Sequence, residues 1–111
     1  MELLFADDRL QHLAQSIVRC DAHFGPSDGA LVRQRLSELA AAENLTIAAS
    51  VPTLAVRPLA SGTGGFAVRV RARLRLVFQI VDRVAVERNS GVDFSKVQTI
   101  RILAFEECDE P

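Results

Sequence analysis

Apolar residues recur at helical spacing in two segments of the N-terminal half. In the first segment they follow the pattern of an amphipathic helix: Leu10, Leu13, Ala14, Ile17 and Val18. This pattern predicts a helix over residues 8–20, with the acidic side chains of Asp7 and Asp8 at its N-terminus, where the helix dipole favours negative charge.

A second helix is predicted after the turn of residues 24–29, which contains Gly and Pro. Ser27 or Asp28 is placed to cap this helix, and the helix is expected to end near Asn44. Its apolar positions repeat at helical spacing and are assigned to the core: Val32, Leu36, Leu39 and Ala40. Two helices joined by a short turn form an antiparallel hairpin.

Strands are predicted at both ends of the chain and in its middle. Residues 54–59 indicate a short strand at a sheet edge, because Pro58 cannot donate to the hydrogen-bond ladder. The apolar run at residues 3–5 predicts another edge strand, and residues 97–105 predict the last strand before an acidic tail. The Gly-rich segment at residues 61–65 is a loop without the Lys and the following helix of a phosphate-binding P-loop.

The segment of residues 66–81 places apolar residues on one parity and arginines on the other: Arg69, Arg71, Arg73 and Arg75. Because a single strand of this length is unusual, a hairpin is expected. A three-residue loop over residues 71–73 keeps the core face apolar and pairs Arg69 with Arg75. Facing like charges cost roughly a few tenths of a kcal/mol. The pairing therefore favours a bound anion or an acidic partner over the alternative, a solvated strand face.

Length and element order predict the fold class. A chain of 111 residues supports one domain, residues 1–111. Its composition, with 49% apolar and 24% charged residues, disfavours disorder. The order of elements predicts an α+β fold, in which an N-terminal two-helix hairpin packs on one face of a twisted, mainly antiparallel sheet of three to five strands.

Charge is distributed unevenly along the chain. Residues 1–56 carry −3, residues 57–101 carry +6 and residues 102–111 carry −4, which gives the formal net charge of −1. All but one of the 13 basic residues are Arg, which binds phosphate and carboxylate through forked contacts, although a G+C-rich genome produces the same bias. The basic segment predicts a local anionic partner.

The sequence lacks the residues that several functional classes need. Cys20 and Cys108 have no metal-ligand spacing and are expected to be reduced thiols. His12 and His23 have no ligand-spaced neighbours and are expected at the surface. No metal and no cofactor are therefore expected. The chain has no run of 18 apolar residues and an acidic start, so we expect a cytoplasmic protein without a membrane partner.

Four segments together resemble a known family. They are LFADDRL at residues 4–10, RPL at residues 57–59 before a Gly-rich loop, GFAVRVRARLRLVF at residues 65–78, and VDFSKVQTIRIL at residues 92–103. In order and spacing the chain resembles the RelE/ParE superfamily of bacterial toxins, in its HigB-like plasmid maintenance killer branch. The resemblance implies the toxin of a type II toxin–antitoxin pair, which inhibits translation by cutting mRNA on the ribosome.

The implied reaction is attack of a ribose 2'-hydroxyl on the neighbouring phosphate, which needs positive charge and groups that transfer protons. By resemblance, Arg75 and Arg57 fall on basic positions of the family. The family's Lys after Pro-Leu is replaced by Ala60, and its ending Val-Asp-Tyr-His aligns with residues 106–109, so only Glu107 keeps an acidic position. The implied partners are the ribosome, mRNA and a cognate antitoxin, commonly of helix-turn-helix type.

The candidate site therefore combines phosphate-binding arginines with carboxylates. The predicted catalytic residues are Arg75, Arg73, Glu107 and Asp109, and the predicted RNA-binding residues are Arg57, Arg69 and Arg71. Because an ordinary carboxyl group is a poor proton donor at neutral pH, the alternative is a protein that binds without cleaving. Such a protein is either a ParE-like inhibitor of DNA gyrase or a degenerate toxin that binds only its antitoxin.

Overall fold

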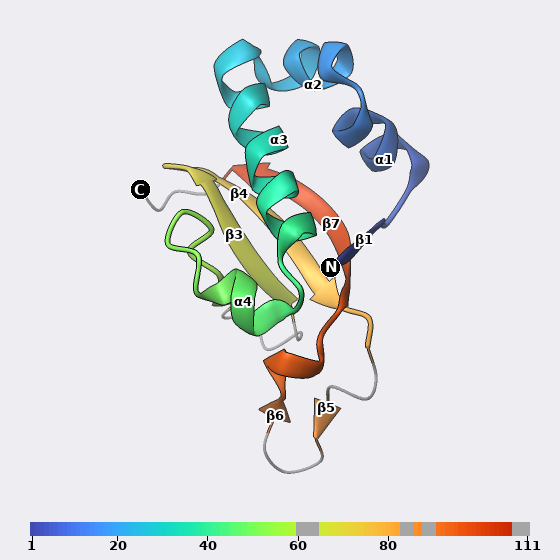
Figure 1. Ribbon diagram of the computed structural model, residues 1–111. Coiled ribbons are helices and arrows are strands. Elements are labelled where there is room, and N and C mark those ends of the chain that lie inside the picture. The colour runs from blue at the N-terminus through green and yellow to red at the C-terminus, as the bar shows by residue number, and fades with distance from the viewer. Residues whose placement is uncertain (60–64, 83–85, 88–90, 108–111) are drawn as a thin grey trace.

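The computed structural model describes residues 1–59, 65–82, 86–87 and 91–107, and has an α+β fold (Figure 1). The helices are α1 (Asp8–Gln15), α2 (Ile17–Phe24), α3 (Pro26–Ala41), α4 (Leu45–Ala49) and the short 3-10 helix η2 (Phe94–Lys96). In spatial order, the strands of the sheet are β1 (Glu2–Phe5), β7 (Thr99–Glu107), β4 (Leu74–Ile80), β3 (Gly65–Arg71) and β2 (Arg57–Pro58). Two further strands, β5 (Val86–Glu87) and β6 (Gly91–Val92), form a separate pair.

The sheet is mainly antiparallel, which confirms the predicted fold class. Only the pairing of β1 with β7 is parallel, and β1 and β2 form the two edges, as their sequences predict. In the described part of the chain, no helix is both long and apolar enough to cross a membrane.

The core lies between the helices and one face of the sheet. Helix α3 crosses this face (Figure 1) and contributes Val32, Leu36 and Leu39, which are buried as predicted. The sheet contributes alternate residues of three strands: Phe66, Val68, Val70, Leu74, Leu76, Phe78, Ile100 and Ile102. Ala67 and Val77 are buried but do not belong to this core, because strand alternation places them on the opposite face.

The predicted first helix is two helices that meet at Ser16. Ser16 has an extended backbone (φ −117°, ψ 119°), and its side chain accepts a hydrogen bond from the backbone N–H of Arg19 at 3.2 Å. A serine that caps a new helix competes with continuation of the old one. The break turns Ile17 and Val18 outward, where 63% and 79% of their surfaces are exposed. Their assignment to the buried face was therefore wrong.

The second predicted helix is the single helix α3, but its N-cap differs from the predicted one. Its N-cap is Gly25 (φ 88°), with Pro26 in the first turn, so the prediction of a Ser27 or Asp28 cap was wrong. Helix α3 ends at Ala41, and Asn44 begins the short helix α4 by accepting a hydrogen bond from the N–H of Ile47 at 3.0 Å. This helix covers the lower end of the core with Leu45 and Ala48.

Candidate functional site

The arginine hairpin of β3 and β4 has the predicted central pair but a different turn. Arg69 faces Arg75 across the strands, as expected. The turn consists of two residues, Ala72 and Arg73, and not three, because Arg73 adopts a positive φ of 71° and β3 has an extra residue at Val70.

The bulge at Val70 reverses the direction of Arg71. Beyond the bulge, Arg71 pairs with the core residue Leu74 and so lies on the helix side of the sheet. Its Nε donates to Asp28 Oδ2 of α3 at 2.8 Å, and its Nη1 donates to the carbonyl oxygen of Ala72 at 2.6 Å. The prediction that Arg71 shares a face with Arg69 and Arg75 was therefore wrong.

Four arginines share the sheet face opposite the helices, which we call the arginine face: Arg57, Arg69, Arg75 and Arg101. Arg57 pairs with Ala67, Arg69 with Arg75, and Arg101 with Gln79, and cross-strand partners lie on the same face. Arg57 and Arg69 are exposed, whereas Arg75 and Arg101 are half-buried. Arg75 and Gln79 lie four residues apart on β4. The cross-strand row that contains Arg75 is therefore about 13 Å from the row that contains Gln79 and its partner Arg101.

The arginine face also carries two carboxylates: Glu2, which pairs with Thr99 on the same side as Arg101, and Glu106. Glu106 pairs with Arg75 across β4 and β7, and its Oε1 accepts bonds from Arg75 Nε at 2.7 Å and Nη2 at 2.5 Å. The row across the sheet is therefore Arg69, Arg75 and Glu106. The Glu106 carboxylate relieves the repulsion between the two arginines and occupies the position that a phosphate would take.

Glu107 lies on the other side of the sheet, because it pairs with Leu74. It lines a small hollow, the tip hollow, with a volume of about 260 Å³. The lining residues of the tip hollow are His23, Phe24, Asp28, Arg71, Leu74, Phe105 and Glu107. The structure thus brings Glu107 together with Arg71 but not with Arg69 and Arg75.

The remaining predicted site residues are Arg73 and Asp109. Arg73 is exposed in the turn between the arginine face and the tip hollow. Asp109 and Cys108, together with Ala60 and the Gly-rich loop, lie outside the described residues.

Sequence reasoning missed Arg101 and His23. A signal for Arg101 existed, since it alternates with the core residues Ile100 and Ile102 in a predicted strand. His23 is exposed, as expected, but its position beside residues 71 and 107 had no signal in the sequence.

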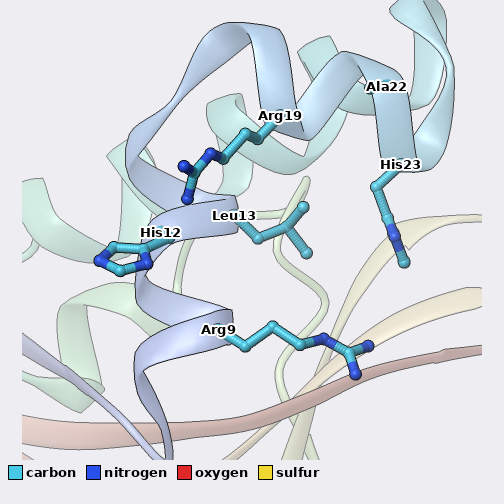
Figure 2. Close-up of a pocket in the computed structure, with 6 residues that line it drawn as sticks. All are labelled: Arg9, His12, Leu13, Arg19, Ala22 and His23. Carbon is cyan, nitrogen blue, oxygen red and sulfur yellow. The ribbon is translucent and has the colours of Figure 1, made fainter.

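A second hollow, of about 640 Å³, lies between α1 and α2. In Figure 2, Leu13 lies between Arg9 and Arg19, and His12 points to the opposite side of α1 from Leu13. His23 lines both hollows. Apart from His23, none of the side chains that line the tip hollow belongs to this second hollow.

The structure assigns Cys20 a structural position. Its side chain is fully buried, the thiol donates to the carbonyl oxygen of Gly29 at 3.6 Å, and burial raises the pKa of the thiol. Among the residues that the structure describes, no three potential metal ligands gather at one place.

No family model matches the chain, and no curated protein matches it. The chemistry of the site therefore has to be argued from its geometry. The arginine face can bind a chain of phosphates, while the tip hollow holds a histidine, two carboxylates and an arginine that can transfer protons and stabilise negative charge.

Proposed function

We propose that this protein is the toxin of a bacterial toxin–antitoxin pair, which inhibits translation by binding and cutting mRNA on the ribosome. The observation that carries the proposal is the arginine face. Four arginines against the two carboxylates of Glu2 and Glu106 give this face a net charge of +2 in a chain with a net charge of −1.

The spacing of the arginines favours an extended polyanion. The arginines of this face lie on four strands, and the rows of Arg75 and Arg101 are about 13 Å apart. A single small anion would contact one row, whereas a nucleic-acid strand supplies several phosphates and gains affinity from each contact. Arginine also suits this role because its planar fork matches the phosphate group.

The resemblance to HigB-like toxins adds the ribosome and mRNA as partners and a cognate antitoxin as the inhibitor. The matched segments form the edge strand β1, the hairpin and the last strand, which together make the sheet that presents the arginine face. The role proposed for this face is to hold the phosphates of mRNA next to the bond that is cut.

The proposal can be tested in a purified translation system with a reporter mRNA. The parent protein is expected to stop protein synthesis and to leave new mRNA ends within the codon at the ribosomal A site. Arg75→Ala is expected to reduce the rate by about tenfold or more at low mRNA concentration, because it removes a phosphate contact that holds the mRNA in place. Lys96→Ala, which removes an exposed positive charge outside the arginine face, is the matched control. Undiminished synthesis with the parent protein would refute the proposal.

A specific observation favours a second candidate, a toxin that binds without cutting. Arg75 already engages Glu106, and the other carboxylate of the arginine face, Glu2, lies on the edge strand β1, three strands away from Arg69. A protein of this kind would bind RNA and leave mRNA intact, or would inhibit DNA gyrase. A supercoiling assay with purified gyrase distinguishes the gyrase inhibitor, which would block the supercoiling of relaxed DNA without affecting translation.

A further inference from the structure

We infer that the tip hollow is the catalytic centre, where His23 and Glu107 transfer the protons of RNA cleavage and Arg71 binds the reacting phosphate. This inference rests on the proposed RNA cleavage and names its residues. The hollow gathers ionisable side chains from four elements, since His23 lies on α2, Asp28 on α3, Arg71 on β3 and Glu107 on β7.

Arg71 is positioned before any ligand binds. Its Nε is held by Asp28 and its Nη1 by the carbonyl oxygen of Ala72, so the guanidinium is fixed through two of its three nitrogens. A donor that is already oriented stabilises developing charge without the cost of reorganisation. The side chain is 36% exposed, so a phosphate can reach the third nitrogen, Nη2.

The aromatic residues of the hollow orient His23. The rings of His23 and Phe24 meet edge to face with centroids 4.7 Å apart, and Phe24 meets Phe105 in the same way at 5.3 Å. These contacts restrict the imidazole, which is nevertheless exposed at the rim of the hollow. Glu107 is exposed at the same rim, so both proton-transfer groups are accessible to a substrate.

The hollow is smaller than the usual site for a whole nucleotide and suits a phosphate with part of the neighbouring ribose. Its volume of about 260 Å³ lies just below the roughly 300–1,000 Å³ of sites for drug-sized ligands. Arg73 is exposed in the hairpin turn, which connects Arg71 of the hollow with Arg75 of the arginine face along the chain. An RNA strand that passes around the hairpin tip would place one phosphate at Arg71 and neighbouring phosphates on the arginine face.

The reaction balances with these groups alone. Glu107 accepts the proton of the ribose 2'-hydroxyl, and the 2'-oxygen forms a bond to phosphorus. The bond between phosphorus and the 5'-oxygen breaks as protonated His23 donates its proton to that oxygen. The products are a 2',3'-cyclic phosphate and a 5'-hydroxyl, and exchange with water returns Glu107 and His23 to their starting protonation states. Arg71 stabilises the charge on the non-bridging oxygens.

The chain contains a matched pair of histidines for the test. His23→Asn and His12→Asn each remove one exposed imidazole from a helix, but only His23 lines the tip hollow. Cleavage of reporter mRNA in the purified translation system gives the rate, and labelling of new 5'-hydroxyl ends identifies the product. Fluorescence anisotropy with a short single-stranded RNA that carries 2'-O-methyl riboses gives the affinity without cleavage.

We expect His23→Asn to lower the cleavage rate by about 10²–10⁴-fold, the usual contribution of a general acid, with the RNA affinity unchanged. Glu107→Gln should lower the rate similarly, and His12→Asn should match the parent. Circular dichroism confirms that each variant folds. If the parent protein cleaves and His23→Asn cleaves equally well, the assignment of the tip hollow is wrong and the proposed function stands. If the parent protein does not affect translation, both fail.

Discussion

Replacement of Glu106 by Gln is expected to raise the affinity of the arginine face for RNA. In the structure, the Glu106 carboxylate occupies the fork of Arg75, so a phosphate has to displace it before it can bind there. Gln keeps the shape and removes the charge. The variant therefore tests whether the internal carboxylate and the RNA phosphate compete for the same guanidinium.

The size of the effect follows from Coulomb's law. A phosphate on Arg75 would lie about 6 Å from the Glu106 carboxylate, because both anions approach one guanidinium. The repulsion at that distance is about 0.7 kcal/mol for a dielectric constant of 80 and about 1.4 kcal/mol for 40. Removal of the charge should therefore increase the affinity by roughly three- to tenfold. Stability should fall by at most about 1 kcal/mol, because the Arg75 and Glu106 side chains are 35% and 42% exposed.

The assay is anisotropy with the 2'-O-methyl RNA at several salt concentrations. If a phosphate gains Arg75 as a contact, the plot of log affinity against log salt should steepen by about 0.7, the value for single strands. Glu43→Gln is the matched control, because it removes an exposed carboxylate from the loop between α3 and α4. The same exchange in an Arg75→Ala background measures the coupling between the two residues.

Two results would refute this reasoning. If Glu43→Gln raised the affinity as much as Glu106→Gln, overall charge and not competition for Arg75 would explain the gain. If Glu106→Gln gave its full gain in the Arg75→Ala background, the carboxylate would act independently of the guanidinium that it contacts.

Three further predictions concern the framework of the site. Gly29→Ala should lower the free energy of unfolding by about 1–3 kcal/mol, because the new methyl group would meet the Asp21 carboxylate and lie 3.2 Å from the Cα of Asp21. Urea denaturation measures this change. An unchanged midpoint would contradict the close contact of α2 and α3. Cys20 should resist iodoacetamide in the native protein and react in urea, as peptide-resolved mass spectrometry can show, because burial raises the pKa of its thiol and blocks access. Asp93→Ala should destabilise the protein at pH 7. The hydrogen bonds from the hydroxyl and backbone N–H of Ser95 lower the Asp93 pKa below 3.8. The ionised carboxylate therefore contributes to stability above about pH 4. As the pH falls further, the difference in thermal unfolding between variant and parent should vanish.

The sequence allowed the main features of the sheet to be predicted, because strand alternation is a local property. Alternation predicted the apolar face of the hairpin and the facing pair of Arg69 and Arg75, and both predictions are confirmed. Alternation does not reveal a bulge, since Val70 remains apolar and buried on either side of the irregularity. Arg71 was therefore assigned to the wrong face.

Local patterns also could not predict the division of the first helix or the tip hollow. The apolar period continues through Ser16, and only the capping hydrogen bond to Arg19 reveals the break. The tip hollow joins residues 23, 28, 71 and 107, which tertiary packing alone brings together. The role of Glu106 depends on the register of β4 against β7, which places it opposite Arg75 and not in a free tail.

The break at Ser16 also has a consequence for the dynamics of the protein. Helix α1 contains no buried residue, and its eight residues are too few to be stable as an isolated helix. Its amide protons are therefore expected to exchange with solvent through local opening, at a lower free energy than those of α3, which is anchored in the core. The amides of α1 are thus expected to open locally while the sheet, with its arginine face and tip hollow, remains folded.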